Sequence, residues 1–289
     1  LLAYRAEVLY YEGLFNEAMR DLDEAERLAH QLADSTLIAN AYNLKGLLHE
    51  NIQDSKEALP YLRLALQWFP SHPAARYPVT ELHHIHGNLG SYLSTLGQLD
   101  SARRHATRSL QLAEAVHAVR AIAVAQWALG NIALKAEQPD SAVLLYDRSW
   151  AIADAARDHD IGVDALVGRA LALAEAGRAS QAREALTRAR DYLDAHRSGI
   201  GLVTQRNFAR MASRTSLAMN DLSGALQQMG EWHNIDSTIT ANNIRSALAT
   251  QAELLHADNG LEGERLERIR GTAPPDAEKR TRLFPLVAG

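Results

Sequence analysis

Few residues in this chain have the types and the spacing that catalysis or metal binding requires. His83, His84 and His86 lie close together, and imidazoles are common ligands of transition metals. Ligands on a helix must be three or four residues apart to share a face, and only His83 and His86 meet that condition. No HExxH motif accompanies them. We therefore predict no metal site, with His86 partly buried and His83 exposed to solvent.

Asp158, His159 and Asp160 form a second cluster, in which an imidazole between two carboxylates would suit proton transfer. Such a site also needs a nucleophile or a metal, and the sequence supplies neither. Gly199 and Gly201 follow a predicted helix rather than a strand, so they indicate a turn and not a dinucleotide site. The chain has no cysteine, which excludes thiolate catalysis, disulfides and cysteine-bound zinc. We predict a protein that is not an enzyme and binds no metal or cofactor.

The charge balance narrows the choice of partners. The 289 residues carry a formal net charge of −5 at pH 7, and the isoelectric point is about 6.2. Binding to a phosphate backbone needs a positive field, so we expect no nucleic-acid binding by this segment. Hydrophobic residues make up 47% of the chain, which is enough for a packed core.

The elements that must position any site are visible as a repeated pattern of small residues. In six places an alanine follows another small residue by twelve positions. The pairs are Ala6 and Ala18, Gly46 and Ala58, Gly90 and Ala102, Gly130 and Ala142, Ala170 and Ala182, and Ser213 and Ala225. A third small residue follows seven positions later as Ala25, Ala65, Ser109, Ser149 and Ala189. Small side chains at fixed spacing let antiparallel helices approach closely, so we predict six stacked helix pairs.

Turn-forming residues separate the two helices of each pair. Asp54, Asp100 and Asp140 stand where we expect N-caps of the second helices. Tryptophans on the second helices are expected to pack between repeats, at Trp68, Trp150 and Trp232. The pattern thus gives one buried face per helix.

The pattern changes after the sixth pair. Residues 235–257 form a predicted amphipathic helix without a partner, ended by Asn259 and Gly260. Such a helix either caps the array or pairs with a second copy of the chain in a homodimer. The apolar run at residues 283–289 is shorter than the roughly 20 residues of a membrane span. It is either a tail or the start of a truncated transmembrane helix. We expect an array at 1–237, a capping or coiled-coil helix at 238–270 and a linker at 271–289.

The three columns of small residues resemble those of tetratricopeptide (TPR) repeats over residues 1–237. The segments GQLDSA at 97–102 and YDRSWAIAD at 146–154 are similar to that family's turn and second helix. The resemblance implies an all-α, right-handed TPR-like α-solenoid of about six helix pairs with an extra C-terminal helix. TPR units usually have 34 residues, whereas these are spaced by 40 to 44.

Lengthened units followed by a long helix resemble membrane-anchored bacterial signalling regulators with a histidine-kinase or LuxR-type output module. In that group the array senses and dimerises outside the cytoplasmic membrane, so the periplasmic face is the favoured location. Arg280 and Arg282 flank the apolar run on the array side, and the positive-inside rule would instead place the array in the cytoplasm. The alternative is therefore a soluble cytoplasmic TPR adaptor that scaffolds a protein partner.

The resemblance also implies a ligand-binding groove on the first helix of each pair, around the small residue. The polar residues at the family's groove positions are Asn40, Asn43, His84, Asn88, Ser91, Trp127, Asn131, Arg210 and Arg214. Asparagine amides suit a peptide backbone because each both donates and accepts hydrogen bonds. Arg210 and Arg214, four residues apart, could hold a carboxylate, although the family's own carboxylate-binding pattern of Lys and Asn is missing. We predict a protein or peptide partner in this concave groove.

Overall fold

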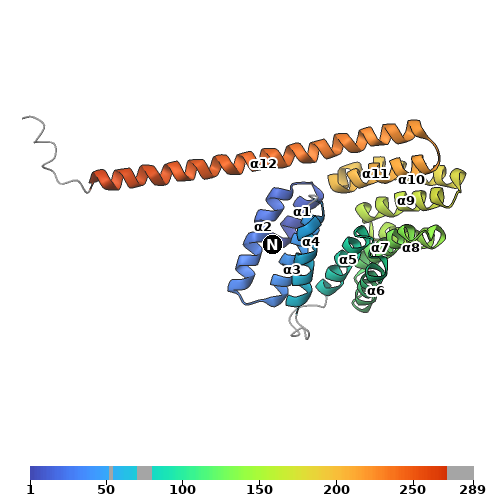
Figure 1. Ribbon diagram of the computed structural model, residues 1–289, viewed down its shortest axis with the longest axis horizontal. Coiled ribbons are helices and arrows are strands. Elements are labelled where there is room, and N and C mark those ends of the chain that lie inside the picture. Colours follow the sequence, from blue (N-terminus) through green and yellow to red (C-terminus); the bar gives the residue numbers. More distant parts are fainter. Residues whose placement is uncertain (52–54, 70–79, 272–289) are drawn as a thin grey trace, which may run out of the picture. The chain divides into compact units, whose positions relative to one another are not determined.

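The computed structural model describes residues 1–51, 55–69 and 80–271. Over these ranges the chain forms twelve α-helices and no strand, as Figure 1 shows, which confirms the predicted all-α solenoid. The chain divides into two units, Leu1–Asn243 and Ile244–Gly289. The first unit contains the helix pairs, and the long last helix continues into the second.

The first unit consists of six antiparallel helix pairs. The first helices of the pairs, called inner helices below, are α1 (Leu2–Tyr11), α3 (Ser35–Asn51), α5 (Thr80–Thr95), α7 (Val119–Lys135), α9 (His159–Glu175) and α11 (Leu202–Ala218). The second helices, called outer helices, are α2 (Phe15–Gln31), α4 (Ser55–Trp68), α6 (Leu99–Ala115), α8 (Pro139–Ala156), α10 (Ala179–His196) and α12 (Leu222–Gly271). A short 3-10 helix, η1 (Arg197–Gly199), joins α10 to α11, so the glycines at 199 and 201 belong to a connection between helices, as predicted.

The columns of small residues lie where the two helices of a pair meet. All six alanines of the second column are buried, with at most 1% of their surface exposed. A Cβ atom on Gly46 would lie 2.6 Å from Leu62 Cγ, and one on Gly90 would lie 3.0 Å from the backbone nitrogen of Ala106. Any larger side chain at these positions would push the paired helices apart.

Tyr146 of α8 shows how neighbouring pairs interlock. Its side chain is fully buried, and its ring lies between Gly130 of α7 and Gly168 of α9. A Cβ atom on either glycine would approach Tyr146 Cε1 to 2.8 Å or 2.6 Å. The Tyr146 hydroxyl donates a hydrogen bond to Asn131 Oδ1 at 2.7 Å. One buried ring therefore links three successive helices and orients a polar side chain of α7.

The turns reverse the chain through residues in the left-handed backbone region, which ends a helix by satisfying its last carbonyls. In the described turns these residues are Gly13, Gly97 and Gly177 together with Ala33, His117, Glu137, Arg157 and Asn220. A side chain at positive φ is strained, so the five non-glycine turns hold a conformation that glycine would adopt more easily.

The prediction of aspartate N-caps was wrong for Asp100 and Asp140. Both helices begin one residue earlier, and each carboxylate lies in the first turn, where it interacts favourably with the helix dipole. Asp54 lies outside the described residues. Asp158 caps the N-terminus of α9, because its carboxylate accepts a hydrogen bond from the Ile161 N–H at 3.2 Å. The sequence pattern did not predict this cap.

The first helix pair packs against the sixth within the Leu1–Asn243 unit. Tyr10 and Phe15 share a hydrophobic cluster with Val203 of α11 and Ile239 of α12, and Ile239 is only 3% exposed. Ile239 also covers Gly13, where an added Cβ would lie 2.8 Å from Ile239 Cγ1. The two ends of the array are therefore in contact with each other beside its concave face.

Polar contacts complete this closure. The Asn243 side-chain amide donates to the Gly13 carbonyl at 2.7 Å, and the Asn16 N–H donates to Asn243 Oδ1 at 3.1 Å. Gly201, at the start of α11, lies so close to Tyr11 that an added Cβ would be 2.7 Å from the Tyr11 carbonyl oxygen. We call this set, together with the Ile239 cluster, the closing contacts.

The last helix differs from the sequence prediction. Residues 222–271 form one continuous helix, so the expected break at Asn259 and Gly260 is wrong. A glycine and an asparagine weaken a helix without ending it when residues on both sides continue the pattern. None of the described helices combines the length and the apolar character that crossing a bilayer requires. The apolar run at residues 283–289 lies outside the described residues.

Candidate peptide-binding site

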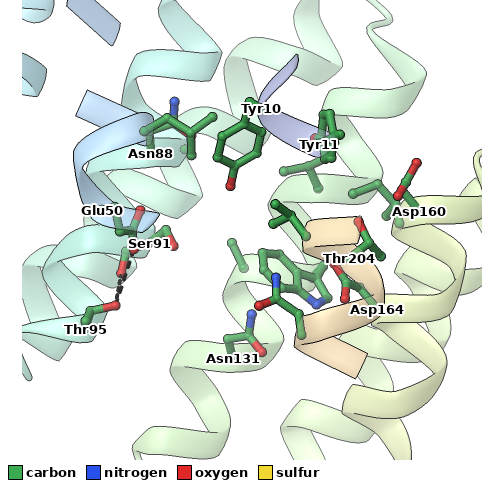
Figure 2. A pocket seen from close by; sticks show the side chains of 18 of the residues that line it. Tyr10, Tyr11, Glu50, Asn88, Ser91, Thr95, Asn131, Asp160, Asp164 and Thr204 are labelled. Carbon is green, nitrogen blue, oxygen red and sulfur yellow. Dashed lines mark hydrogen bonds between the residues drawn. The ribbon is translucent and has the colours of Figure 1, made fainter. Parts of the chain in front are cut away.

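The inner helices line a central cavity of about 840 Å³. Figure 2 shows Glu50, Ser91 and Thr95 on one wall and Asp160, Asp164 and Thr204 on the opposite wall. The structure brings together on this surface all nine residues predicted for the groove, namely Asn40, Asn43, His84, Asn88, Ser91, Trp127, Asn131, Arg210 and Arg214. Their role in binding a ligand stays a prediction.

Three of the amides in the wall are held by hydrogen bonds. Asn88 Nδ2 donates to Asn43 Oδ1 at 3.0 Å, which joins α5 to α3. Asn131 Oδ1 accepts a hydrogen bond from the hydroxyl of Tyr146. The NH₂ group of Asn131 has no acceptor among the described residues. An amide held by its oxygen leaves two N–H donors for a ligand.

Basic side chains line the wall on α7 and α11, and most of them are already paired. Arg206 lies 3.3 Å from Asp236, and Arg214 lies 3.2 Å from Glu175. Lys135 Nζ donates to the Ser94 carbonyl at 2.9 Å. Arg210 lies between Arg206 and Arg214 on the same helix face and makes no hydrogen bond or ion pair with any residue that the structure describes.

Two carboxyl groups of the wall have strongly raised pKa values. Burial raises the pKa of Glu50 to about 7, although Thr95 donates to Glu50 Oε1 at 3.5 Å and Lys135 and Arg210 favour the ionised form. Burial, followed by the negative charge of Asp160, raises the pKa of Asp164 to about 8. At neutral pH, Asp164 is therefore mostly protonated and Glu50 is about half ionised.

The histidines behave differently from the sequence prediction. His83 is 2% exposed, so the expectation of a solvated side chain is wrong, and neither of its ring nitrogens has a hydrogen-bond partner within the described part of the chain. It is buried because α6 packs against this part of α5, where Ser109 Oγ donates to the His83 carbonyl at 2.7 Å. His86 is half-buried, with Nδ1 2.9 Å from His105 Nδ1. Over the described ranges there is no cluster of three or more metal-ligating side chains.

His84 is the histidine that faces the cavity. Its ring is accessible from the cavity, yet the enclosure desolvates it. This desolvation, followed by the nearby His83 and Arg120, lowers the pKa of His84 to about 4. The imidazole is therefore neutral at pH 7 and adds no charge to the site.

Several residues of the wall were missed by the sequence reasoning. Tyr10 and Tyr11 line the cavity because the first helix pair packs against the sixth. Trp232 of α12 also lines the cavity, although we expected it to pack between repeats. Asp164 and Asn207 lie six residues before Ala170 and Ser213, the same offset that places Asn40 and His84 before their glycines. Applying that offset to every repeat would have found both residues.

A smaller hollow of about 520 Å³ continues the cavity past α1. Arg120 joins the two spaces: its guanidinium donates to the Tyr11 hydroxyl at 3.0 Å and lies 2.7 Å from Asp158. The cluster of Asp158, His159 and Asp160 lines this hollow. Its carboxylates serve as a helix cap and ion-pair partner and as the acceptor of the Gly201 N–H at 3.2 Å.

Comparisons with known proteins agree with this architecture. Two tetratricopeptide-repeat family models match residues 39–72 and residues 81–155. No curated protein matches the chain. A Rap protein in complex with competence and sporulation factor has a similar structure, with a TM-score of 0.61, 13% identity, and coverage of 83% of this chain and 75% of that one.

Two further solved structures are similar in fold. Aspartyl phosphate phosphatase F from Bacillus subtilis has a TM-score of 0.62 and 14% identity, with coverage of 99% of this chain and 73% of that one. BtubC from P. vanneervenii has a TM-score of 0.56 and 15% identity, with coverage of 78% and 91%. At such low identity the likeness concerns the fold. The matched family models show that the chain contains TPR repeats, and the columns of small residues and the six stacked helix pairs agree with them. TPR repeats are protein-interaction modules.

Proposed function

We propose that the central cavity is a binding site for a short extended peptide. The observation that carries the proposal is that the closing contacts bring the two ends of the array together around a partly open cavity of about 840 Å³, lined by amide, charged and aromatic side chains. Cavities of this size suit a small ligand or a chain segment and not the surface of a folded protein. The structural likeness to a Rap protein in complex with competence and sporulation factor supports a partner held by an array of this fold.

The cavity volume limits how much of the segment can lie inside the cavity. An extended residue rises about 3.4 Å, and neighbouring strands and sheets lie about 4.8 Å and 10 Å apart, so one residue fills about 160 Å³. A space of about 840 Å³ therefore holds about five residues. The amides of Asn88 and Asn131 face this segment and can replace the hydrogen bonds that its backbone loses with water.

Affinity selection with synthetic pentapeptides tests the proposal. The immobilised chain is incubated with a pool of pentapeptides, and retained peptides are identified by mass spectrometry and titrated by calorimetry. Ser91→Trp adds an indole to the cavity wall, whereas Ser141→Trp adds the same group to the exposed surface of α8. We expect Ser91→Trp to abolish binding and Ser141→Trp to preserve it. Equal binding by both variants, or no peptide retained by the wild type, would contradict a peptide site in the cavity.

We also propose that the array is the sensory region of a bacterial signal-transduction protein. In this role, a change of conformation caused by the bound peptide would be passed on through the long helix α12. A ligand can do this only if it binds one arrangement of the array better than another. The alternative role is that of a cytoplasmic adaptor without a membrane anchor. Fractionation of cells that express the complete gene product separates the two roles, because the sensor version requires the protein in the membrane fraction.

A homodimer through residues 235–257 would have to form without Ile239, which was one of the apolar side chains expected to pair. Ile239 is occupied by the closing contacts, whereas Ile244 and Leu248 are 57% and 60% exposed and lie four residues apart on α12. Pairing of two such helices would bury these side chains. Replacing both by aspartate should lower the molar mass in light scattering from dimer to monomer. An unchanged molar mass would remove dimerisation from the proposal.

A further inference from the structure

The sixth helix pair exposes large apolar side chains where the stack of pairs ends. Leu217 of α11 and Leu222, Leu226 and Met229 of α12 are between 48% and 69% exposed. We call these four residues the sixth-pair edge. The three on α12 are spaced by four and three residues, so they share one face of the helix. Apolar side chains that are grouped on a surface in this way usually mark a contact.

The repeat register shows how the same positions are covered elsewhere in the chain. Met229 lies four residues after Ala225, and its counterparts in the other pairs are buried or half-buried, namely Leu22, Leu62, Ala106, Tyr146 and Leu186. Each counterpart shares a hydrophobic cluster with residues of the next inner helix. Met229 is exposed because α12 is the last helix of the described chain. One more helix, in the place of a next inner helix, would therefore cover the sixth-pair edge.

The later turns of α12 carry an apolar face that matches this need. Ile244 and Leu248 are more than half exposed and lie four residues apart. Helical spacing places them on the same side of α12 as Leu222, Leu226 and Met229, within an arc of about 100°. Because α12 is one continuous helix, it cannot fold back on itself. This face can therefore cover the sixth-pair edge only of a second copy of the chain.

Two α12 helices complement each other when they lie antiparallel about a two-fold axis at Ser237. Leu226 of one copy then lies opposite Leu248 of the other, and Gly230 lies opposite Ile244. A Cβ atom on Gly230 would meet no atom within 4 Å, so the surface there has room for an isoleucine. No acidic or basic residue lies on this face of α12 between positions 222 and 248. Two copies, each with a net charge of −5, can thus approach without like charges in contact.

We infer that two copies of this chain dimerise through antiparallel α12 helices, with Ile244 and Leu248 of each copy packed on the sixth-pair edge of the other. The inference rests on the homodimer of the proposed function and adds the surface and the orientation of the contact. A two-fold arrangement uses the same surface on both copies and closes after two copies. Each copy thereby supplies the helix that a seventh pair would supply to the other.

Light scattering of the full chain tests the role of the sixth-pair edge. Leu226→Asp places a charge in the contact, and Leu144→Asp is the matched control, because Leu144 is a similarly exposed leucine on the outer helix α8. We expect twice the chain mass of 31.8 kDa for the wild type and for Leu144→Asp. Leu226→Asp should raise the dimer Kd at least about 100-fold, because two leucine side chains leave the contact in each dimer. Circular dichroism melts should be alike for the two variants, since neither leucine is buried.

Cysteine cross-linking tests the orientation, because the chain has no cysteine of its own. In the antiparallel arrangement, positions 226 and 248 of different copies face each other. The two copies of position 248 lie about 33 Å apart along the helices, at about 1.5 Å per residue, whereas a disulfide needs Cα atoms less than about 7 Å apart. Leu226→Cys and Leu248→Cys should therefore cross-link when they are mixed and oxidised, and neither should cross-link with itself. Parallel pairing would give the reverse result.

The outcomes separate this inference from the homodimer on which it rests. If Leu226→Asp stays dimeric while the double aspartate variant of Ile244 and Leu248 is monomeric, the homodimer stands and the antiparallel contact is overturned. Cross-linking of Leu248→Cys with itself would have the same meaning. A monomeric wild type, with the edge left to another segment or to another protein, would remove both the homodimer and the inference. None of these results bears on peptide binding in the cavity.

Discussion

Replacing Ile239 by alanine should release the first helix pair from the end of the array. Ile239 is 3% exposed and packs into the cluster that joins Tyr10 and Phe15 of the first pair to Val203. The substitution removes three carbon atoms of the side chain, and each buried methyl or methylene group contributes about 0.8 kcal/mol to the free energy of unfolding. The expected loss is therefore about 2.4 kcal/mol before any cavity term is added. This loss weakens the docking of α1 and α2, because Ile239 holds the first helix pair against the sixth and each of the other pairs keeps its contacts with its neighbours.

Hydrogen exchange measures this effect locally. A loss of about 2.4 kcal/mol corresponds to about 50-fold faster exchange of the amides whose protection depends on that docking. We expect the acceleration in residues 2–31 and none in α8 or α9. Ile244→Ala is the control, because the same side chain five residues later is 57% exposed. It should change exchange by no more than about twofold.

Unchanged exchange in residues 2–31, or an equal acceleration across all six pairs, would contradict this role of Ile239. The first result would mean that the closing contacts add no stability, and the second that the array unfolds as a single unit. A weaker peptide affinity of Ile239→Ala should accompany the loosening, because Tyr10 and Tyr11 leave the cavity wall.

Four further substitutions test other features by urea unfolding. The pKa of Asp164 is raised to about 8, so the folded chain holds a proton that the unfolded chain releases near pH 4, and stability falls as pH rises between these values by up to about 1.4 kcal/mol per pH unit; Asp164→Asn should flatten this slope between pH 5 and pH 8, whereas Asn at the exposed Asp191 should not. Glu137→Gly should raise the unfolding free energy by about 0.5 to 1 kcal/mol, because φ is 56° there, and Gly97→Ala at φ 75° should lower it by a similar amount. Tyr146→Phe should lower it by about 1 kcal/mol, because the hydroxyl lies 2.7 Å from its amide acceptor; an unchanged value in any of these experiments would contradict the corresponding contact.

The repeat architecture could be predicted because it is encoded locally. Gly46 and Ala58 must be small for two helices to touch, and the same demand recurs in each pair at the same spacing. The positions of Asn131 and Arg210 on the inner face follow from that register, which is why the predicted groove residues share one cavity wall.

Closure of the array could not be predicted in this way. Asn16 and Asn243 are hydrogen-bonded across 227 positions of sequence, and no local pattern records that they meet. The raised pKa values of Glu50 and Asp164 come from burial by several helices together, which no local pattern records either. His83 was misjudged because a helical wheel shows one helix, whereas its burial depends on how α6 lies against α5.

The contact between Gly201 and Tyr11 also limits how this protein can evolve. Open solenoids gain and lose units freely, since each new unit simply extends the stack. Here a seventh helix pair inserted between the first and the sixth would move Gly201 away from Tyr11 and separate Asn16 from Asn243. The closing contacts thus require six helix pairs. Duplication of a pair, the usual source of variety among repeat proteins, would break these contacts and open the central cavity.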